Sequence, residues 1–416
     1  MRAKNLAVSV LLLALLLPAG AAFGRICSVD KAPGATLLLP YFEVDLDRAP
    51  LGRTTLFSIA NASAASILTN VTVWSDLGVP VLWFHLYLTG YDVQTINVRD
   101  ILNGVLPRTA SRGQDPDDTI SPQGQLSQDI SFASCAGFLP LPNVPPSFVD
   151  HLRKALTGRR SEIFLACAGQ NLGDNVARGY VTVDTISRCE IKNPSEPGYF
   201  GPGGVATNQN VLWGDFILVD QEQNFAQGED LVRLEADPSR FPNGSSTFYG
   251  RYVNDSGADA REPLPSLWGA RYLVGGAFTG GTDFLVWRES GGVVRPFPCG
   301  AVPPPFPLLT QEQAYFDEEE NVVVPWQFIF DPPLPREALQ RQFPAESNRV
   351  DAAEDYGVAF PFGWLYIDVG PSLGAPPGHA LQGWMGTLVS AERRFSVGMN
   401  ATPLRESCPP VLSGSR

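Results

Sequence analysis

Short runs of β-branched and aromatic residues alternate with turn-forming residues along most of this chain. Near the N-terminus, glycine, proline, aspartate and asparagine separate runs that occupy residues 36–47, 54–60, 68–74, 81–88 and 93–98. In residues 81–88, the apolar Leu82 and Phe84 alternate with Trp83 and His85, which is the two-residue period of a β-strand. Regularly spaced short strands are typical of antiparallel sandwiches and barrels.

Residues 107–146 break this pattern with proline-rich and aspartate-rich sequence, which we interpret as a long surface insertion. A short helix is predicted at residues 147–156, with Ser147 as its N-cap and Gly158 just past its end. Strand-like runs then resume at residues 163–168, 180–186, 211–219, 231–234, 247–252, 267–273, 283–287, 322–330, 363–369, 383–389 and 395–399.

These patterns predict a mainly β fold of one or two antiparallel β-sandwiches, with a long loop-rich insertion and one short helix. We divide the chain into a signal segment at residues 1–24, an N-terminal sandwich-like region at 25–106, the insertion with its helix at 107–160, and a second β-rich region at 161–416. A hydrophobic fraction of 44% is sufficient for a buried core.

Residues 1–24 have the layout of a secretory signal peptide. Arg2 and Lys4 form a cationic start, residues 6–17 form an apolar run, and small residues follow up to Gly24. The apolar run is too short for a comfortable membrane span. We therefore expect a secreted or periplasmic protein that has no membrane span after signal removal.

The cysteine count favours three disulfides in an exported chain, and the six residues are Cys27, Cys135, Cys167, Cys189, Cys299 and Cys408. Cys167 and Cys189 lie on or beside consecutive strand-like runs, so we predict that they pair with each other. Cys27 and Cys408 either join the two ends of the mature chain or pair with their nearer neighbours, Cys135 and Cys299.

The formal net charge of −13 narrows the range of partners. It argues against nucleic acid and against docking on anionic membranes, because both favour a basic protein surface. The metalloprotease pattern HExxH and the Walker phosphate loop do not occur. The histidines His85, His151 and His379 lie in unrelated contexts, so we lean toward a non-enzymatic protein.

Three acids on one predicted strand form a candidate calcium site. Glu43, Asp45 and Asp47 are spaced two residues apart, so their carboxylates leave the same face of the strand. Ca²⁺ prefers such oxygen ligands. The alternative is a solvated strand edge whose charges prevent aggregation.

Two aromatic residues form a candidate ligand-binding surface. Trp83 and Tyr87 are four residues apart on one strand, so both rings lie on the same side and could stack on a sugar. The alternative is packing against a covering layer of the fold.

Three blocks carry a resemblance to known proteins, namely ATLLLPYFEVD at 35–45, TTLFSIAN at 54–61 and YLTGYDVQTIN at 87–97. With the later segments FPC at 297–299 and YFDEEE at 315–320, the chain resembles a group of exported bacterial proteins with no assigned activity. The resemblance covers about a third of the chain. It implies export and an N-terminal β-sandwich-like region, and it brings no catalytic motif.

The sequence thus favours an exported, non-enzymatic binding or structural protein of the bacterial periplasm or cell exterior. A carbohydrate-active enzyme or a lectin-like glycan-binding module is the alternative. The expected partners are a glycan or a cell-surface protein, and calcium is the one cofactor that the residues suggest.

Overall fold

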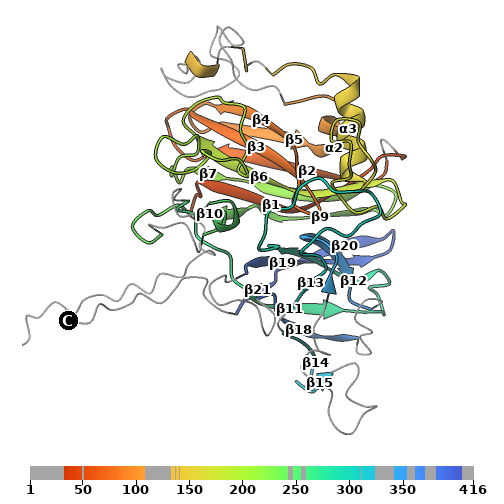
Figure 1. Cartoon of the computed structure of the whole chain (residues 1–416). Helices are drawn as coiled ribbons and strands as arrows, with labels where there is room; N and C mark the ends of the chain where they lie inside the picture. The colour runs from red at the N-terminus through yellow and green to blue at the C-terminus, as the bar shows by residue number, and fades with distance from the viewer. Residues whose placement is uncertain are drawn as a thin grey trace, which may run out of the picture.

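Antiparallel sheets make up most of the structure, a computed structural model that describes residues 32–48, 51–107, 133–135, 137–139, 141–241, 247–253, 259–310, 312–323, 342–353, 361–370 and 381–404. Figure 1 shows these sheets in two stacked units, with N-terminal strands in the upper unit and C-terminal strands in the lower one. The prediction of a mainly β fold is confirmed. The predicted signal peptide, Cys27 and Cys408 lie outside the described residues.

The N-terminal unit contains two sheets. The first has the strand order β10-β1-β6-β3-β4, with bounds β1 Thr36–Asp45, β3 Ile67–Ser75, β4 Pro80–Leu88, β6 Val176–Ile186 and β10 Val232–Leu234. Strands β1 and β3 are buried along their whole length, because both faces of this sheet are covered. The second sheet has the order β5-β2-β8-β9, with β7 beside β2, and bounds β2 Thr54–Asn61, β5 Val93–Asn97, β7 Leu212–Trp213, β8 Asp215–Asp220 and β9 Phe225–Asp230.

The C-terminal unit also contains two main sheets. One has the order β15-β14-β18-β11-β21, with bounds β11 Leu267–Leu273, β14 Glu312–Asp317, β15 Val322–Val323, β18 Phe362–Asp368 and β21 Thr402–Pro403. The other has the order β17-β12-β19-β20, with bounds β12 Gly281–Arg288, β17 Ser347–Asp351, β19 Gly383–Ala391 and β20 Phe395–Met399. A short pair joins β13 Leu308–Leu309 to β16 Gln342–Phe343.

The N-terminal sandwich draws strands from both sides of the insertion. Strands β6 and β10 come from the region predicted at 161–416, yet both pair with β1. Strands β8 and β9 likewise complete the sheet that β2 begins. Residues 161–234 therefore contribute to the first sandwich, and the second sandwich begins with β11.

The predicted helix is present as α3, Pro146–Leu156, and packs against β4 and β6. It begins one residue earlier than expected, with Pro145 as N-cap and no side-chain cap, so the role predicted for Ser147 is wrong. Proline suits the first helical turn because its missing N–H needs no partner there. A second short helix, α2 at Val98–Leu102, is capped by the Asn97 side chain. No described helix has both the length and the apolar composition needed to cross a membrane.

Two predicted strands are wrong. Residues 163–165 form a turn, with the exposed Leu165 at φ 55°, and the rest of the segment forms isolated bridges, Ser161 with Ala166 and Cys167 with Phe297. Residues 250–252 form a 3₁₀ helix, η2, within the predicted strand 247–252. In both cases local apolar composition is typical of a strand, but neither segment joins one of the named sheets.

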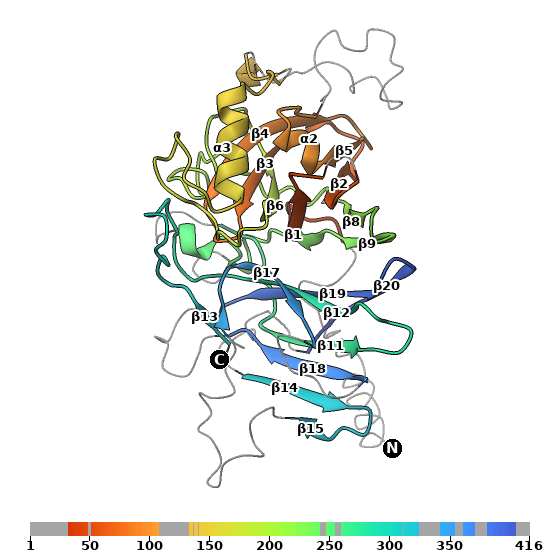
Figure 2. The same cartoon turned by 90° about the vertical axis from the view of Figure 1, so that its right-hand side faces the viewer.

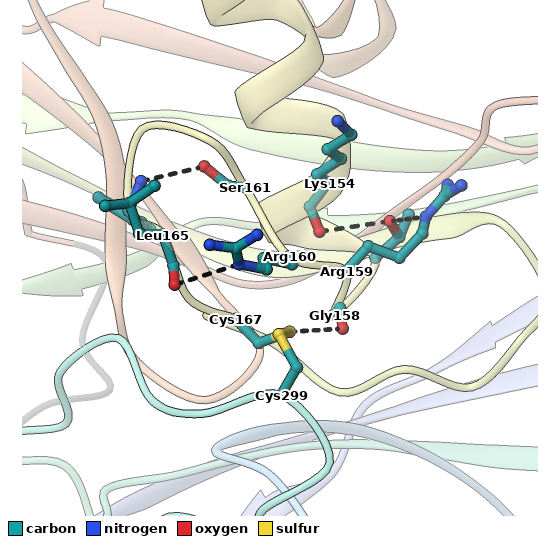
Figure 3. The surroundings of a disulfide bond; sticks show 10 residues. Lys154, Gly158, Arg159, Arg160, Ser161, Leu165, Cys167 and Cys299 are labelled. Carbon is teal, nitrogen blue, oxygen red and sulfur yellow. Dashed lines mark hydrogen bonds between the residues drawn. A yellow bond between two sulfur atoms is a disulfide. The ribbon is translucent and has the colours of Figure 1, made fainter.

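The described disulfides are Cys135–Cys189 and Cys167–Cys299, so the predicted Cys167–Cys189 pair is wrong. The 11-residue strand β6 lies between Cys167 and Cys189 and separates them by roughly 36 Å of extended chain. The pairing of Cys27 or Cys408 with a nearer neighbour is also excluded, because Cys135 and Cys299 are bonded elsewhere. Figure 3 shows the second disulfide beside Gly158, whose carbonyl lies 3.2 Å from the Cys167 sulfur.

The two units share one continuous apolar core. Strands β12 and β17 of the C-terminal unit contact β1 of the N-terminal unit, and β17 also contacts β6; Figure 2 shows β17 below β1. Paired main-chain hydrogen bonds of 2.9 Å between Cys167 and Phe297 reinforce the connection made by the disulfide.

Candidate functional site

An apolar cavity of about 450 Å³ lies against the edge strand β4. Its walls come from β4, from Leu106 in the chain after helix α2, from the start of α3 with the chain that leads into it, and from Ile191. We call it the β4 groove, and its principal lining side chains are Trp83, His85, Phe138, Leu141, Phe148 and Ile191. Figure 1 shows the gold segment before α3 passing above β4. The volume falls within the range of ligand pockets.

The structure places Trp83 and Tyr87 in different surroundings. Trp83 is half-buried and lines the groove. Tyr87 is fully buried and is not part of the groove lining. The two rings therefore do not form one exposed platform, although the two-residue period of the strand is correct.

His85 supplies the groove with a polar group. The side chain is only 4% exposed, and burial lowers its pKa to about 4, so the imidazole is neutral at physiological pH. Its Nε2 accepts a 3.2 Å hydrogen bond from the Glu190 main-chain N–H. The ring proton must then be on Nδ1, which has no hydrogen-bond partner among the described residues.

The disulfide Cys135–Cys189 holds the rim of the groove. It joins the short 3₁₀ helix η1, Ala133–Cys135, to the chain just before Ile191, with Cα atoms 4.9 Å apart. The Phe138 N–H donates a 3.0 Å hydrogen bond to the Cys135 carbonyl, and the Phe138 ring lies 5.7 Å from that of His85. The disulfide and this hydrogen bond therefore hold Phe138 in place beside β4 before any ligand binds.

The chemistry of the groove is that of a binding site. Its described lining contains no carboxylate, amine, guanidinium, hydroxyl or thiol group. Apart from indole and imidazole N–H groups, the polar side chain is that of the exposed Asn143. A neutral imidazole donor in an apolar cavity can orient a ligand, but no described nucleophile lies beside it.

The acids predicted to bind calcium are each engaged by protein groups. Glu43 is buried, and its carboxylate contacts Arg349 at 2.5 Å and Arg53 at 3.3 Å and accepts a 3.1 Å bond from the Tyr41 hydroxyl. Burial by itself would raise the pKa of Glu43, but the guanidinium groups of Arg349 and Arg53 outweigh it and hold the pKa below its ordinary value.

Asp45 and Asp47 have partners of their own. Asp45 receives a 2.7 Å bond from the Arg48 side chain and main-chain bonds from Asp47 and Arg48, while Asp47 accepts a bond from the Asn175 amide. Among the described residues, no three metal-ligating side chains gather at one point. This geometry gives the calcium hypothesis no support.

Sequence reasoning missed most of the groove because Phe138, Leu141 and Phe148 belong to the insertion that we interpreted as surface loop, or to the helix after it. The available signal was the set of apolar residues close to Cys135.

One pattern typical of catalytic serines also escaped notice: residues 370–374 read Gly-Pro-Ser-Leu-Gly, which fits GxSxG. Ser372 lies outside the described residues.

No protein-family model, curated protein or solved structure matches this chain. The assignment of a function therefore depends on the geometry of the chain itself, and the resemblance to exported bacterial proteins stays a prediction.

Proposed function

We propose that this protein is an exported, non-enzymatic binding protein whose β4 groove holds a small, neutral, largely apolar ligand with one hydrogen-bond acceptor. The observation that carries the proposal is a preformed apolar cavity of about 450 Å³ lined by His85, whose neutral imidazole has a buried Nδ1–H with no partner among the described residues. Burying a ligand acceptor against this donor would satisfy a group that is otherwise costly to leave unpaired.

Export is part of the same proposal and depends on residues 1–24. The two described disulfides support it, since structural disulfides persist in oxidising compartments. The glycan-binding alternative has less support in the groove, because Tyr87 is buried and the lining lacks the carboxylates that accept bonds from sugar hydroxyls.

A fluorescence titration with prodan, a neutral naphthalene that carries one ketone, tests the groove. We expect a blue shift on binding, and Trp83→Ala should weaken the affinity at least roughly tenfold through loss of an aromatic wall. Trp213→Ala is the matched control, because Trp213 is 49% exposed on β7 and is not part of the groove. Equal affinity for prodan in the wild type and Trp83→Ala would overturn the proposal.

The role of His85 is separable from that of Trp83. His85→Phe keeps an aromatic wall but removes the N–H donor. The affinity for prodan should therefore fall, while the affinity for 2-dimethylaminonaphthalene, which lacks the ketone, should stay unchanged.

A hydrolysis assay tests the non-enzymatic assignment. Hydrolysis of p-nitrophenyl esters that is present in the wild type and lost in Ser372→Ala would show that the protein is an enzyme and would contradict this assignment.

A further inference from the structure

A second hollow, of about 460 Å³, opens between the two sandwiches. One wall is formed by residues 228–233 of β9 and β10, in the N-terminal unit. The opposite side is formed by Trp268 of β11 and Trp384 of β19, and residues 400–403 lie at the edge. We call this hollow the inter-sandwich cleft. Clefts between two packed units are frequent ligand sites.

Glu229 brings an uncompensated acid to this cleft. Its Oε1 is shut off from solvent, and no described residue donates a hydrogen bond to this atom or forms an ion pair with Glu229. Burial, with the like charge of Asp230 beside it, raises the pKa of Glu229 to about 7. An acid in such a position lacks the cation that normally stabilises its charged form.

The other charges of the cleft cancel each other. Asp230 and Arg233 form an ion pair at 3.1 Å, and both line the cleft. Ionised Glu229 therefore leaves the described lining with one net negative charge. The chain as a whole, at −13, adds a field that attracts cations.

The two tryptophans give the cleft an aromatic floor. The Trp268 Nε1–H donates to the carbonyls of Pro265 at 3.2 Å and Gly383 at 3.1 Å, which fixes the ring. The Trp384 ring packs edge-on against Phe216, with centroids 6.5 Å apart. Both indoles are largely buried, so the floor has a low dielectric, which strengthens the attraction between Glu229 and a cation.

We propose that the inter-sandwich cleft binds a small organic cation, an alkylammonium or trimethylammonium group, whose charge is compensated by Glu229 above the tryptophan floor. This site is separate from the β4 groove and does not depend on it. A metal ion fits the cleft less well, because no group of three metal-ligating side chains occurs among the described residues.

Calorimetry with matched probes tests the proposal. Choline and n-butylammonium should bind at pH 8.5, whereas 3,3-dimethylbutan-1-ol, the neutral isostere of choline, should not. Both cations keep their charge at pH 5.5, but Glu229 is then protonated, so their affinity should fall at least roughly tenfold. Absence of binding by both cations at pH 8.5, or equal binding of the neutral isostere, would overturn the proposal.

A variant then assigns the charge to Glu229. Glu229→Gln keeps the shape of the side chain and should abolish both the binding of choline and its pH dependence. Glu318→Gln, which removes an exposed acid outside the cleft, is the matched control. Far-ultraviolet circular dichroism and a cooperative urea transition report whether Glu229→Gln is folded. If the variant is not folded, the pH dependence of choline binding by the wild type tests the proposal. Unchanged choline affinity in a folded Glu229→Gln protein would also refute the assignment.

Discussion

Tyr180 of β6 donates a 2.8 Å hydrogen bond from its hydroxyl to Oε2 of Glu346, although 166 residues separate the two in the chain. Glu346 is completely buried. Its carboxylate also accepts a 3.0 Å hydrogen bond from the Ser290 N–H and forms an ion pair with Arg251. One carboxylate thereby ties the N-terminal sandwich to η2 and to the C-terminal sandwich. The contact therefore adds to the shared core and the Cys167–Cys299 disulfide in holding the two units together.

Removing the charge of Glu346 should destabilise the protein strongly. In Glu346→Gln the buried Arg251 loses its ionic partner, and we expect the free energy of unfolding to fall by about 3–5 kcal/mol. Urea denaturation followed by tryptophan fluorescence measures the change. Glu222→Gln, in the exposed pair with Arg48, should leave the urea midpoint close to that of the wild type. A midpoint for Glu346→Gln equal to that control would show that the contact does not hold the units together.

A buried aspartate should make stability depend on pH. Burial raises the pKa of Asp76 to about 7, although the Gln170 N–H donates a 3.1 Å bond to it. The folded state then binds a proton that the unfolded state has lost between about pH 4 and pH 7, so the contribution of Asp76 to stability falls as the pH rises through this window. The full effect is on the order of 4 kcal/mol.

Comparison with Asp76→Asn isolates this effect. Burial lowers the pKa of His85, which acts in the opposite direction over part of the same window, so the wild-type curve alone combines both groups. Asparagine keeps an acceptor for the Gln170 N–H and does not titrate. The stability of Asp76→Asn relative to the wild type should therefore increase between pH 5 and pH 8, as measured by urea unfolding at each pH. A constant difference would show that Asp76 has an ordinary pKa.

The candidate sites show what the sequence could predict. The alternation in residues 81–88 correctly predicts β4, and it places Trp83 on the face that lines the β4 groove. The same alternation cannot show that Tyr87 is covered, because burial depends on residues distant in the sequence. Phe138 joins the groove through a disulfide whose pairing is not encoded in local sequence.

The inter-sandwich cleft illustrates the same limit more strongly. Glu229 lies between the strands predicted at 211–219 and 231–234, and nothing in its neighbourhood distinguishes it from the other acids of the chain. Trp268 and Trp384 lie on strands that the sequence predicts correctly. Only the packing of one sandwich on the other brings these three residues together. The alternation of residue types predicts which side chains share one face of a strand, but it does not predict which other element packs against that face.

Peptide mapping under non-reducing conditions should recover Cys135 linked to Cys189 and Cys167 linked to Cys299. Replacing Cys135 and Cys189 together by serine opens a 54-residue span, which the chain-entropy model converts to about 4 kcal/mol of lost stability. The same change frees the rim of the β4 groove, so affinity for prodan should also fall. A linked Cys167–Cys189 peptide would contradict both pairings.

Chelation tests the surroundings of Glu43. Because Arg349 and Arg53 neutralise Glu43, and Asp45 is bound by Arg48, we expect excess EDTA to leave the melting temperature unchanged. Arg349→Met is the informative variant, because Glu43 and Asp283 would then lose the guanidinium that both contact at 2.5 Å. Its free energy of unfolding should fall by about 3–5 kcal/mol, with or without chelator. A melting temperature of the wild type that drops in EDTA and recovers with added Ca²⁺ would instead place an ion among these acids and refute their assignment to arginine partners.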